Sequence, residues 1–89
     1  MENKTILTGT AIVIADRGFV YVGEITHDEQ FTTISGARNI RRWGTENGLG
    51  ELALEGPKKD TVLDDTGTVR IPANALIAII DTEAVLWKR

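Results

Sequence analysis

The amino-acid sequence predicts a mainly β fold: a small barrel with one short helix inserted before the last strands. Ten Ile, six Val and eleven Thr make up 27 of the 89 residues, and β-branched side chains fit a pleated strand better than a helix. Apolar runs alternate with turns rich in Gly, Asp and Pro, while helical spacing occurs at only one place. A chain of this length supports a single domain, residues 1–89.

The first half of the chain predicts a meander of three strands. The first strand covers residues 5–14 and ends in a turn at Gly18, which tolerates a positive φ. The second covers residues 19–25. After a polar turn, the third runs from residue 30 to about residue 43, with a bulge or bend at Gly36.

The second half predicts a short helix followed by the last strands. Leu49, Leu52 and Ala53 have helical i, i+3, i+4 spacing, and Gly-Pro ends the segment after residue 55. Residues 61–63 form a brief strand before a hairpin turn at residues 64–67. Strands at residues 68–71 and 75–81 then flank a break that begins with a Pro. This order is typical of an SH3-like or Sm-like barrel, with a small β-sandwich as the alternative.

Three of the predicted strands are apolar at successive positions, although neighbouring side chains on a strand point to opposite faces. These runs are residues 11–14, 19–22 and 76–80. Either the helix and Trp87 cover the second face, or copies of the chain do. We favour a homo-oligomer.

Composition excludes several functions. The chain has no Cys, which removes disulfides, thiolate metal sites and cysteine nucleophiles. Its net charge of −3 disfavours nucleic acid as a partner. It has no apolar run of membrane-spanning length and no signal-peptide pattern at its start, so we expect a soluble protein of the host-cell cytoplasm without a membrane partner.

Enzyme chemistry finds little support in the residues. His27 and Ser35 lie on either side of one predicted turn, but no third orienting group is evident. Asp64 and Asp65 are sequence neighbours that diverge, and an exposed turn explains them better than a metal site. We therefore expect no catalytic residue, metal or cofactor.

One cationic and aromatic segment stands out. Three of the ten cations fall within residues 38–42, directly before an aromatic residue and a Gly-rich run. Guanidinium groups fit phosphate, aromatic planes stack on bases, and glycines let backbone N–H groups approach a ligand. If Ile40 points inward, period-two geometry puts Asn39, Arg41 and Trp43 on the outer face. The predicted ligand-binding residues are Arg38, Asn39, Arg41, Arg42, Trp43, Thr45, Gly48 and Gly50.

Two other interpretations of this segment remain open. The arginines could pair with Glu46, Glu51 or Glu55 while Trp43 belongs to the core. In an oligomer, Arg70 and residues 58–59 of a neighbouring copy could join the pocket.

The run Asn39-Ile-Arg-Arg-Trp-Gly-Thr, continued by Gly48-Leu-Gly-Glu-Leu-Ala and Gly67-Thr-Val-Arg-Ile-Pro, resembles a family of short phage and prophage proteins of unknown function. The resemblance spans residues 9–81 and implies a phage origin without assigning catalytic residues. More loosely, Val22-Gly-Glu-Ile, residues 34–42 and Val69-Arg-Ile-Pro with Ile77 resemble Sm-like proteins, which form rings and bind RNA.

The sequence thus leads to a hypothesis of a non-enzymatic phage protein that binds a small anionic, nucleotide-type ligand. Such a protein would act as an anti-defence sponge, sequestering an immune signalling molecule from its host effector. The alternative is a protein-interaction module, either a virion or assembly component or a direct inhibitor of a host protein. An RNA-binding ring ranks third, because the net charge is negative.

Overall fold

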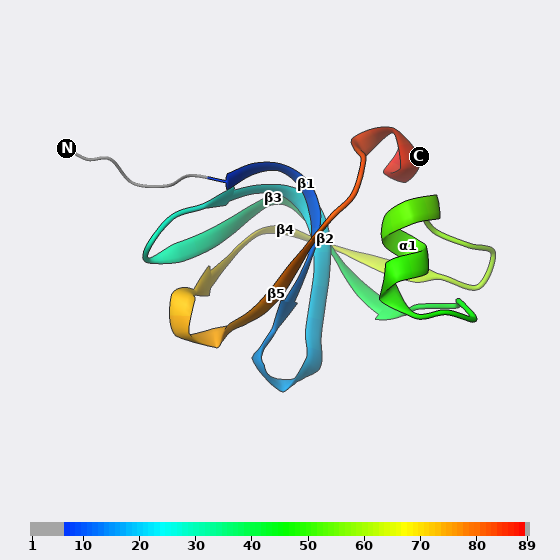
Figure 1. Cartoon of the computed structure of the whole chain (residues 1–89), viewed down its shortest axis with the longest axis horizontal. Helices are drawn as coiled ribbons and strands as arrows, with labels where there is room; N and C mark the ends of the chain where they lie inside the picture. Colours follow the sequence, from blue (N-terminus) through cyan, green and yellow to red (C-terminus); the bar gives the residue numbers. More distant parts are fainter. Residues whose placement is uncertain (1–6, 89) are drawn as a thin grey trace.

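The computed structural model describes residues 7–88 and contains one antiparallel sheet of five strands in the order β4-β3-β2-β1-β5 (Figure 1). The predicted fold class is confirmed: the strands are bent into a small barrel, and one short helix precedes the last two strands. The elements are β1 (Leu7–Ala15), η1 (Asp16–Gly18), β2 (Phe19–His27), β3 (Phe31–Arg42), α1 (Leu49–Glu55), β4 (Val62–Pro72), η2 (Ala73–Ala75), β5 (Leu76–Asp81) and η3 (Ala84–Trp87). The first two residues of the predicted strand 5–14 lie outside the described residues.

Glycine geometry bends β3 as the sequence predicts. Gly36 has a φ of +58°, which favours Gly over residues with a Cβ. The pairing of β3 with β4 shifts register between Ile34 and Ala37, so the bulge lies at Gly36. On β2, a Cβ at Gly23 would come within 2.7 Å of the Ile34 side chain. The two strands therefore approach closely where the sheet bends.

The predicted hairpin turn at residues 64–67 is wrong. These residues lie inside the continuous strand β4, where Asp64 and Asp65 pair with Asn39 and Arg38. The connection from β3 to β4 is instead the long segment that contains α1, so β4 can run along the full length of β3. Gly67, with a φ of +78°, takes up a register shift there rather than a turn.

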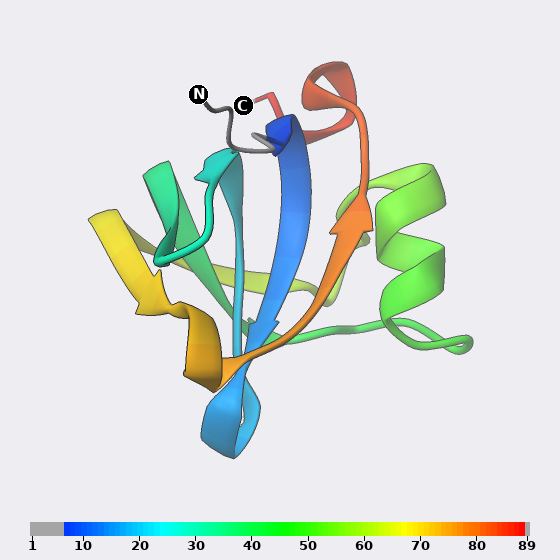
Figure 2. The same cartoon turned by 60° about the vertical axis from the view of Figure 1, so that its left-hand side comes forward.

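Apolar side chains gather on both faces of the sheet. One group, which we call the barrel face, is enclosed by the bent strands; its buried members are Ala11, Val13, Ala15, Ile25, Ile34, Ala37 and Ile71. The other, the helix face, is covered by α1 and η3; its buried members are Ile12, Val20, Val22, Ile40, Leu52, Ala53 and Trp87. Figure 2 shows α1 lying against one side of the sheet, with η3 at its upper end.

The chain itself therefore covers the second apolar face. Trp87 is only 4% exposed, and its indole N–H donates to the Thr82 hydroxyl at 3.0 Å. That hydroxyl in turn donates to the Ala53 carbonyl of α1 at 2.6 Å. The pattern that favoured a homo-oligomer is thus explained without a second copy, and the oligomer stays a prediction. No helix among residues 7–88 has the length and apolar character to cross a bilayer.

Candidate functional site

The structure divides the predicted ligand-binding segment among three places. Arg38 pairs opposite Val22 and lies on the helix face, where its guanidinium donates to the Trp87 carbonyl at 2.8 Å. Asn39 and Arg41 lie on the other side of the sheet. The remaining predicted residues, apart from Arg42 at the end of β3, follow that strand in the loop and the first turn of α1.

Asn39 belongs to a row of polar side chains that crosses three strands. It pairs directly opposite Tyr21 of β2 on one side and Asp64 of β4 on the other, and directly opposed residues of antiparallel strands share a face. Its amide donates to the Val20 carbonyl at 3.0 Å, which fixes the side chain against β2. Tyr21 also packs on the barrel-face cluster, so the row lies at the margin of that face.

Arg41 joins this row through an ion pair. Its Nε donates to Asp64 Oδ2 at 2.7 Å and a terminal nitrogen lies 3.4 Å from Oδ1. The hydrogen bond from Arg41 lowers the pKa of Asp64, and the same bond raises the pKa of Arg41. Both side chains are largely exposed, so the pair contributes little to stability. Asn39 and Arg41 share a face as predicted, but it is not the outer face: Ile40 packs in the helix-face cluster and Asn39 lies at the margin of the barrel face. The alternative pairing with Glu46, Glu51 or Glu55 does not hold for Arg41.

The aromatic side chains of this region, Tyr21 in the row and Phe19 beside it, were not predicted from the sequence. Phe19 and Tyr21 stack with centroids 6.4 Å apart and an interplanar angle of 9°, and Phe19 is 53% exposed. The period-two spacing of aromatics directly after a turn was the available signal. We call Phe19, Tyr21, Asn39, Arg41 and Asp64 together the aromatic patch.

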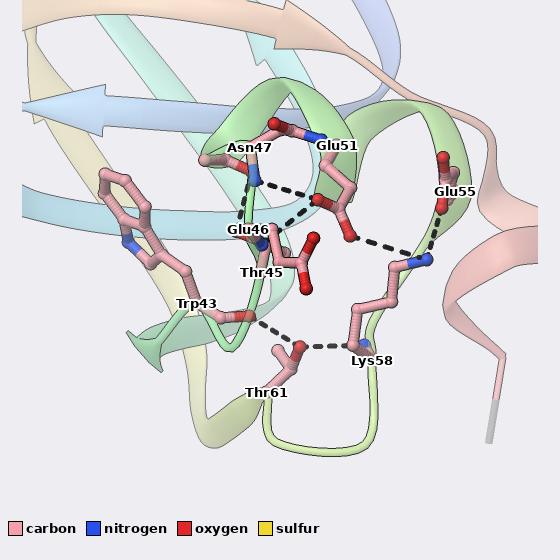
Figure 3. Close-up of polar contacts among 9 residues, drawn as sticks. Trp43, Thr45, Glu46, Asn47, Glu51, Glu55, Lys58 and Thr61 are labelled. Atoms are coloured by element: carbon pink, nitrogen blue, oxygen red, sulfur yellow. Dashed lines mark hydrogen bonds and ion pairs between the residues drawn. The ribbon is translucent and has the colours of Figure 1, made fainter.

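The loop before α1 already holds an anion of its own. The Glu51 carboxylate accepts hydrogen bonds from the backbone N–H groups of Glu46 at 3.2 Å and Asn47 at 2.9 Å (Figure 3). The Lys58 ammonium lies 3.6 Å from the same carboxylate and also pairs with Glu55; the Glu55 bond is the main cause of its raised pKa. The backbone N–H groups of Glu46 and Asn47 therefore stabilise the loop through Glu51 and are not open to an external anion.

The other predicted loop residues have the following places. The Thr45 hydroxyl donates to the Gly48 carbonyl at 3.0 Å, and Gly48, with a φ of +80°, caps α1. Gly50 lies exposed in the first turn of the helix. Trp43 is 42% exposed, so the alternative that placed it in the core is wrong. Its carbonyl accepts from the Thr61 hydroxyl at 2.7 Å, and in Figure 3 its indole points away from the Glu51 network.

Two hollows adjoin Arg38 on the helix face. They have volumes of about 250 and 390 Å³, and Arg38, Trp87 and Lys88 line both. The smaller also includes Ser35 and the larger includes Thr61. Both lie on the opposite side of the sheet from the aromatic patch.

The candidate catalytic residues do not come together. His27 pairs opposite Thr32 and its Nδ1 lies 2.7 Å from the Thr32 hydroxyl, whereas Ser35 pairs opposite Glu24. Asp64 and Asp65 point to opposite faces because they are successive residues of β4. Residues 7–88 contain no cluster of three potential metal-ligating side chains.

The chain matches no family model, no curated protein and no solved structure.

Proposed function

We propose that this chain is a non-catalytic binding protein and that the aromatic patch takes a small nucleotide-type ligand. If the resemblance to phage proteins reflects its origin, such binding would keep a signalling nucleotide away from a host immune effector. The protein would hold its ligand without breaking a bond.

The observation that carries this proposal is an exposed Phe19 stacked on the half-buried Tyr21, next to an exposed guanidinium. Phe19 is 53% exposed and its ring is parallel to that of the half-buried Tyr21, and a base stacked on an exposed aromatic ring gains about 1–3 kcal/mol. Arg41 lies at the same margin of the sheet. An aromatic ring and a guanidinium together match the two parts of a nucleotide, its base and its phosphate.

Arg41 can exchange its partner at small cost. Its side chain is 65% exposed and that of Asp64 is 45% exposed, and solvent screens surface ion pairs of this kind, so they contribute little free energy. A phosphate that replaces Asp64 would form charge-assisted hydrogen bonds with the guanidinium. Arg42, the next residue, is exposed at the end of β3 and is a second candidate for the phosphate.

The test is native mass spectrometry of the chain mixed with a panel of cyclic and linear nucleotides. We expect one or more nucleotides to remain bound, and Arg41→Ala to lose them while keeping the subunit number of the parent chain. Lys88→Ala is the control, because Lys88 is an exposed cation beside the two hollows on the other side of the sheet. Retention by Arg41→Ala, or equal loss in Lys88→Ala, would refute the assignment.

A protein-interaction module is the second candidate. Three apolar side chains outside the aromatic patch favour it, Leu54, Ile77 and Val85, which are all well exposed. Trp87 does not belong to such a surface, because it is buried in the helix-face cluster with Leu52 and Ala53 of α1. Recovery of one stoichiometric protein partner from infected cells, independent of nucleotides and lost in Ile77→Asp, would support this candidate.

A further inference from the structure

We infer that the aromatic patch selects guanine over adenine and that the Asp64 carboxylate recognises the base by accepting hydrogen bonds from it. This inference rests on the proposed function, since it names the class of base that the same site takes. It follows from the hydrogen-bonding groups that the patch presents beside its two rings.

Acceptors dominate the polar part of the patch. The Asn39 amide nitrogen donates one N–H to the Val20 carbonyl, which leaves its carbonyl oxygen and its second N–H for a ligand. Asp64 adds two carboxylate oxygens, and its lowered pKa keeps it ionised at neutral pH. The one strong donor, the Arg41 guanidinium, is engaged with Asp64. A stacked base therefore meets acceptors at its edge.

The ion pair sets a condition on any anionic ligand. A phosphate that takes Arg41 away from Asp64 leaves a carboxylate without its partner close to a second negative charge, which costs free energy. A ligand avoids this cost when it also brings N–H donors to Asp64. The phosphate of the ligand would then bind Arg41, and the N–H donors of the same ligand would bind Asp64.

Guanine brings such donors. Its Watson–Crick edge carries N1–H and N2–H₂ side by side, and a carboxylate can accept both at once. Adenine offers one donor next to an acceptor nitrogen, which would face the carboxylate oxygens without a proton between them. Guanine therefore donates a hydrogen bond to each Asp64 carboxylate oxygen, whereas adenine donates to only one of the two.

The geometry of the row suits this contact. The Phe19 and Tyr21 rings are parallel within 9°, so a base stacked on them is parallel to both. Tyr21, Asn39 and Asp64 are directly opposed on three adjacent strands. Two strand spacings place the Cα atoms of Tyr21 and Asp64 about 10 Å apart. A purine ring followed by a hydrogen bond of about 3 Å spans that distance.

The experiment is a calorimetric titration of GMP, IMP, AMP and XMP into the parent chain and into two variants. IMP lacks only the 2-amino group, and we expect it to bind about tenfold more weakly than GMP, since a hydrogen bond to a charged group is lost. We expect AMP to bind more weakly still. Asp64→Asn should abolish the preference for GMP over AMP, and it should favour XMP, whose N1–H and O2 match an amide.

Asp65→Asn is the matched control. It changes the net charge by the same amount on the neighbouring residue, but Asp65 pairs opposite Arg38 and lies on the other side of the sheet. It should leave the GMP-to-AMP ratio unchanged. Thermal melts of both variants should match that of the parent chain, because the Asp64 side chain is 45% exposed and Asp65 is exposed.

The outcomes separate the two proposals. If GMP, IMP and AMP bind equally well, or if the ratio survives Asp64→Asn, the inference about guanine is wrong while nucleotide binding stands. If none of the three binds and the wider nucleotide panel fails as well, both are wrong. A ratio that collapses in Asp64→Asn and persists in Asp65→Asn supports the inference.

Discussion

Replacing Leu52 by Ala tests whether α1 covers the helix face within a single chain. Leu52 is 0% exposed and packs in the helix-face cluster with Ile12, Ile40 and Trp87. Truncating a fully buried Leu costs about 2–5 kcal/mol, from lost transfer free energy and from the cavity left behind. A domain of this size has a total stability of roughly 4–13 kcal/mol. The change therefore removes a large share of the free energy of unfolding.

The matched control is Leu54→Ala on the same helix. Leu54 is 81% exposed, so the same chemical change at nearly the same helical position should shift the stability by no more than about 0.5 kcal/mol. For a domain of this size, about 3 kcal/mol lowers Tm by roughly 12–24 °C. Thermal and urea unfolding of the parent chain and both variants, followed by circular dichroism, measures the difference.

Two results would refute this reasoning. If Leu52→Ala melts with the parent chain, α1 does not bury Leu52 against the sheet. If Leu54→Ala is as destabilising as Leu52→Ala, Leu54 must be covered as well, and a second copy of the chain is the simplest cover. A strong dependence of Tm on protein concentration would then accompany the effect.

Three further predictions concern the loop and the patch. Urea unfolding should show that Gly44→Ala destabilises the fold by more than about 1 kcal/mol, because φ is +67° and a Cβ would lie 2.6 Å from the Thr61 backbone nitrogen. The control Gly50→Ala, where a Cβ meets no other atom, should be neutral or stabilising. Glu51→Gln should weaken the loop before α1, because the charge that holds two backbone N–H groups is lost, and faster amide hydrogen exchange at those two groups would show it. In an NMR titration, the pKa of the Asp64 carboxyl should lie below its ordinary value of 3.8 and should rise in Arg41→Ala. The ion pair is intact at neutral pH and is lost as the pH falls through this lowered pKa. An unchanged pKa in Arg41→Ala would contradict the ion pair.

Period-two patterns and turn residues predicted the parts of the fold that depend on local sequence. The bulge at Gly36, the helix that starts at Leu49 and the break after Pro72 all appear where the sequence indicates them. The turn at residues 64–67 was wrong because Asp and Gly also occur at bulges, and only the pairing of β4 with all of β3 decides between the two. Strand pairing is a non-local property that local composition does not carry.

The candidate site shows the same limit. That Asn39 and Arg41 share a face could be predicted from alternation along one strand. That Tyr21 lies beside Asn39 could not, because it depends on the register between β2 and β3, which a bulge shifts between Val22 and Glu24. The Gly-rich loop was predicted to bind an anion through Gly48 and Gly50, and local sequence did not show that Glu51 takes the backbone N–H groups of Glu46 and Asn47 in the same loop.

Because the aromatic patch is open, one copy of the chain can bind a nucleotide with only limited affinity. The measured affinity therefore tests whether the chain forms a homo-oligomer. A mononucleotide has about 24 non-hydrogen atoms, and at about 0.3 kcal/mol per atom a typical complex reaches roughly −7 kcal/mol, a Kd of about 10 μM. A single patch touches one side of the base and should do no better. A sequestering protein needs tighter binding than this, which requires a second surface to enclose the ligand.

A second copy of the aromatic patch is one source of that surface. We therefore predict that a Kd below about 0.1 μM coincides with a dimer or larger assembly in native mass spectra, and that a monomer binds no more tightly than about 10 μM. Titrations at several protein concentrations distinguish the two, because affinity that depends on assembly rises with protein concentration. Nanomolar binding by a monomer would contradict the open patch as the site and would direct attention to the two hollows beside Arg38.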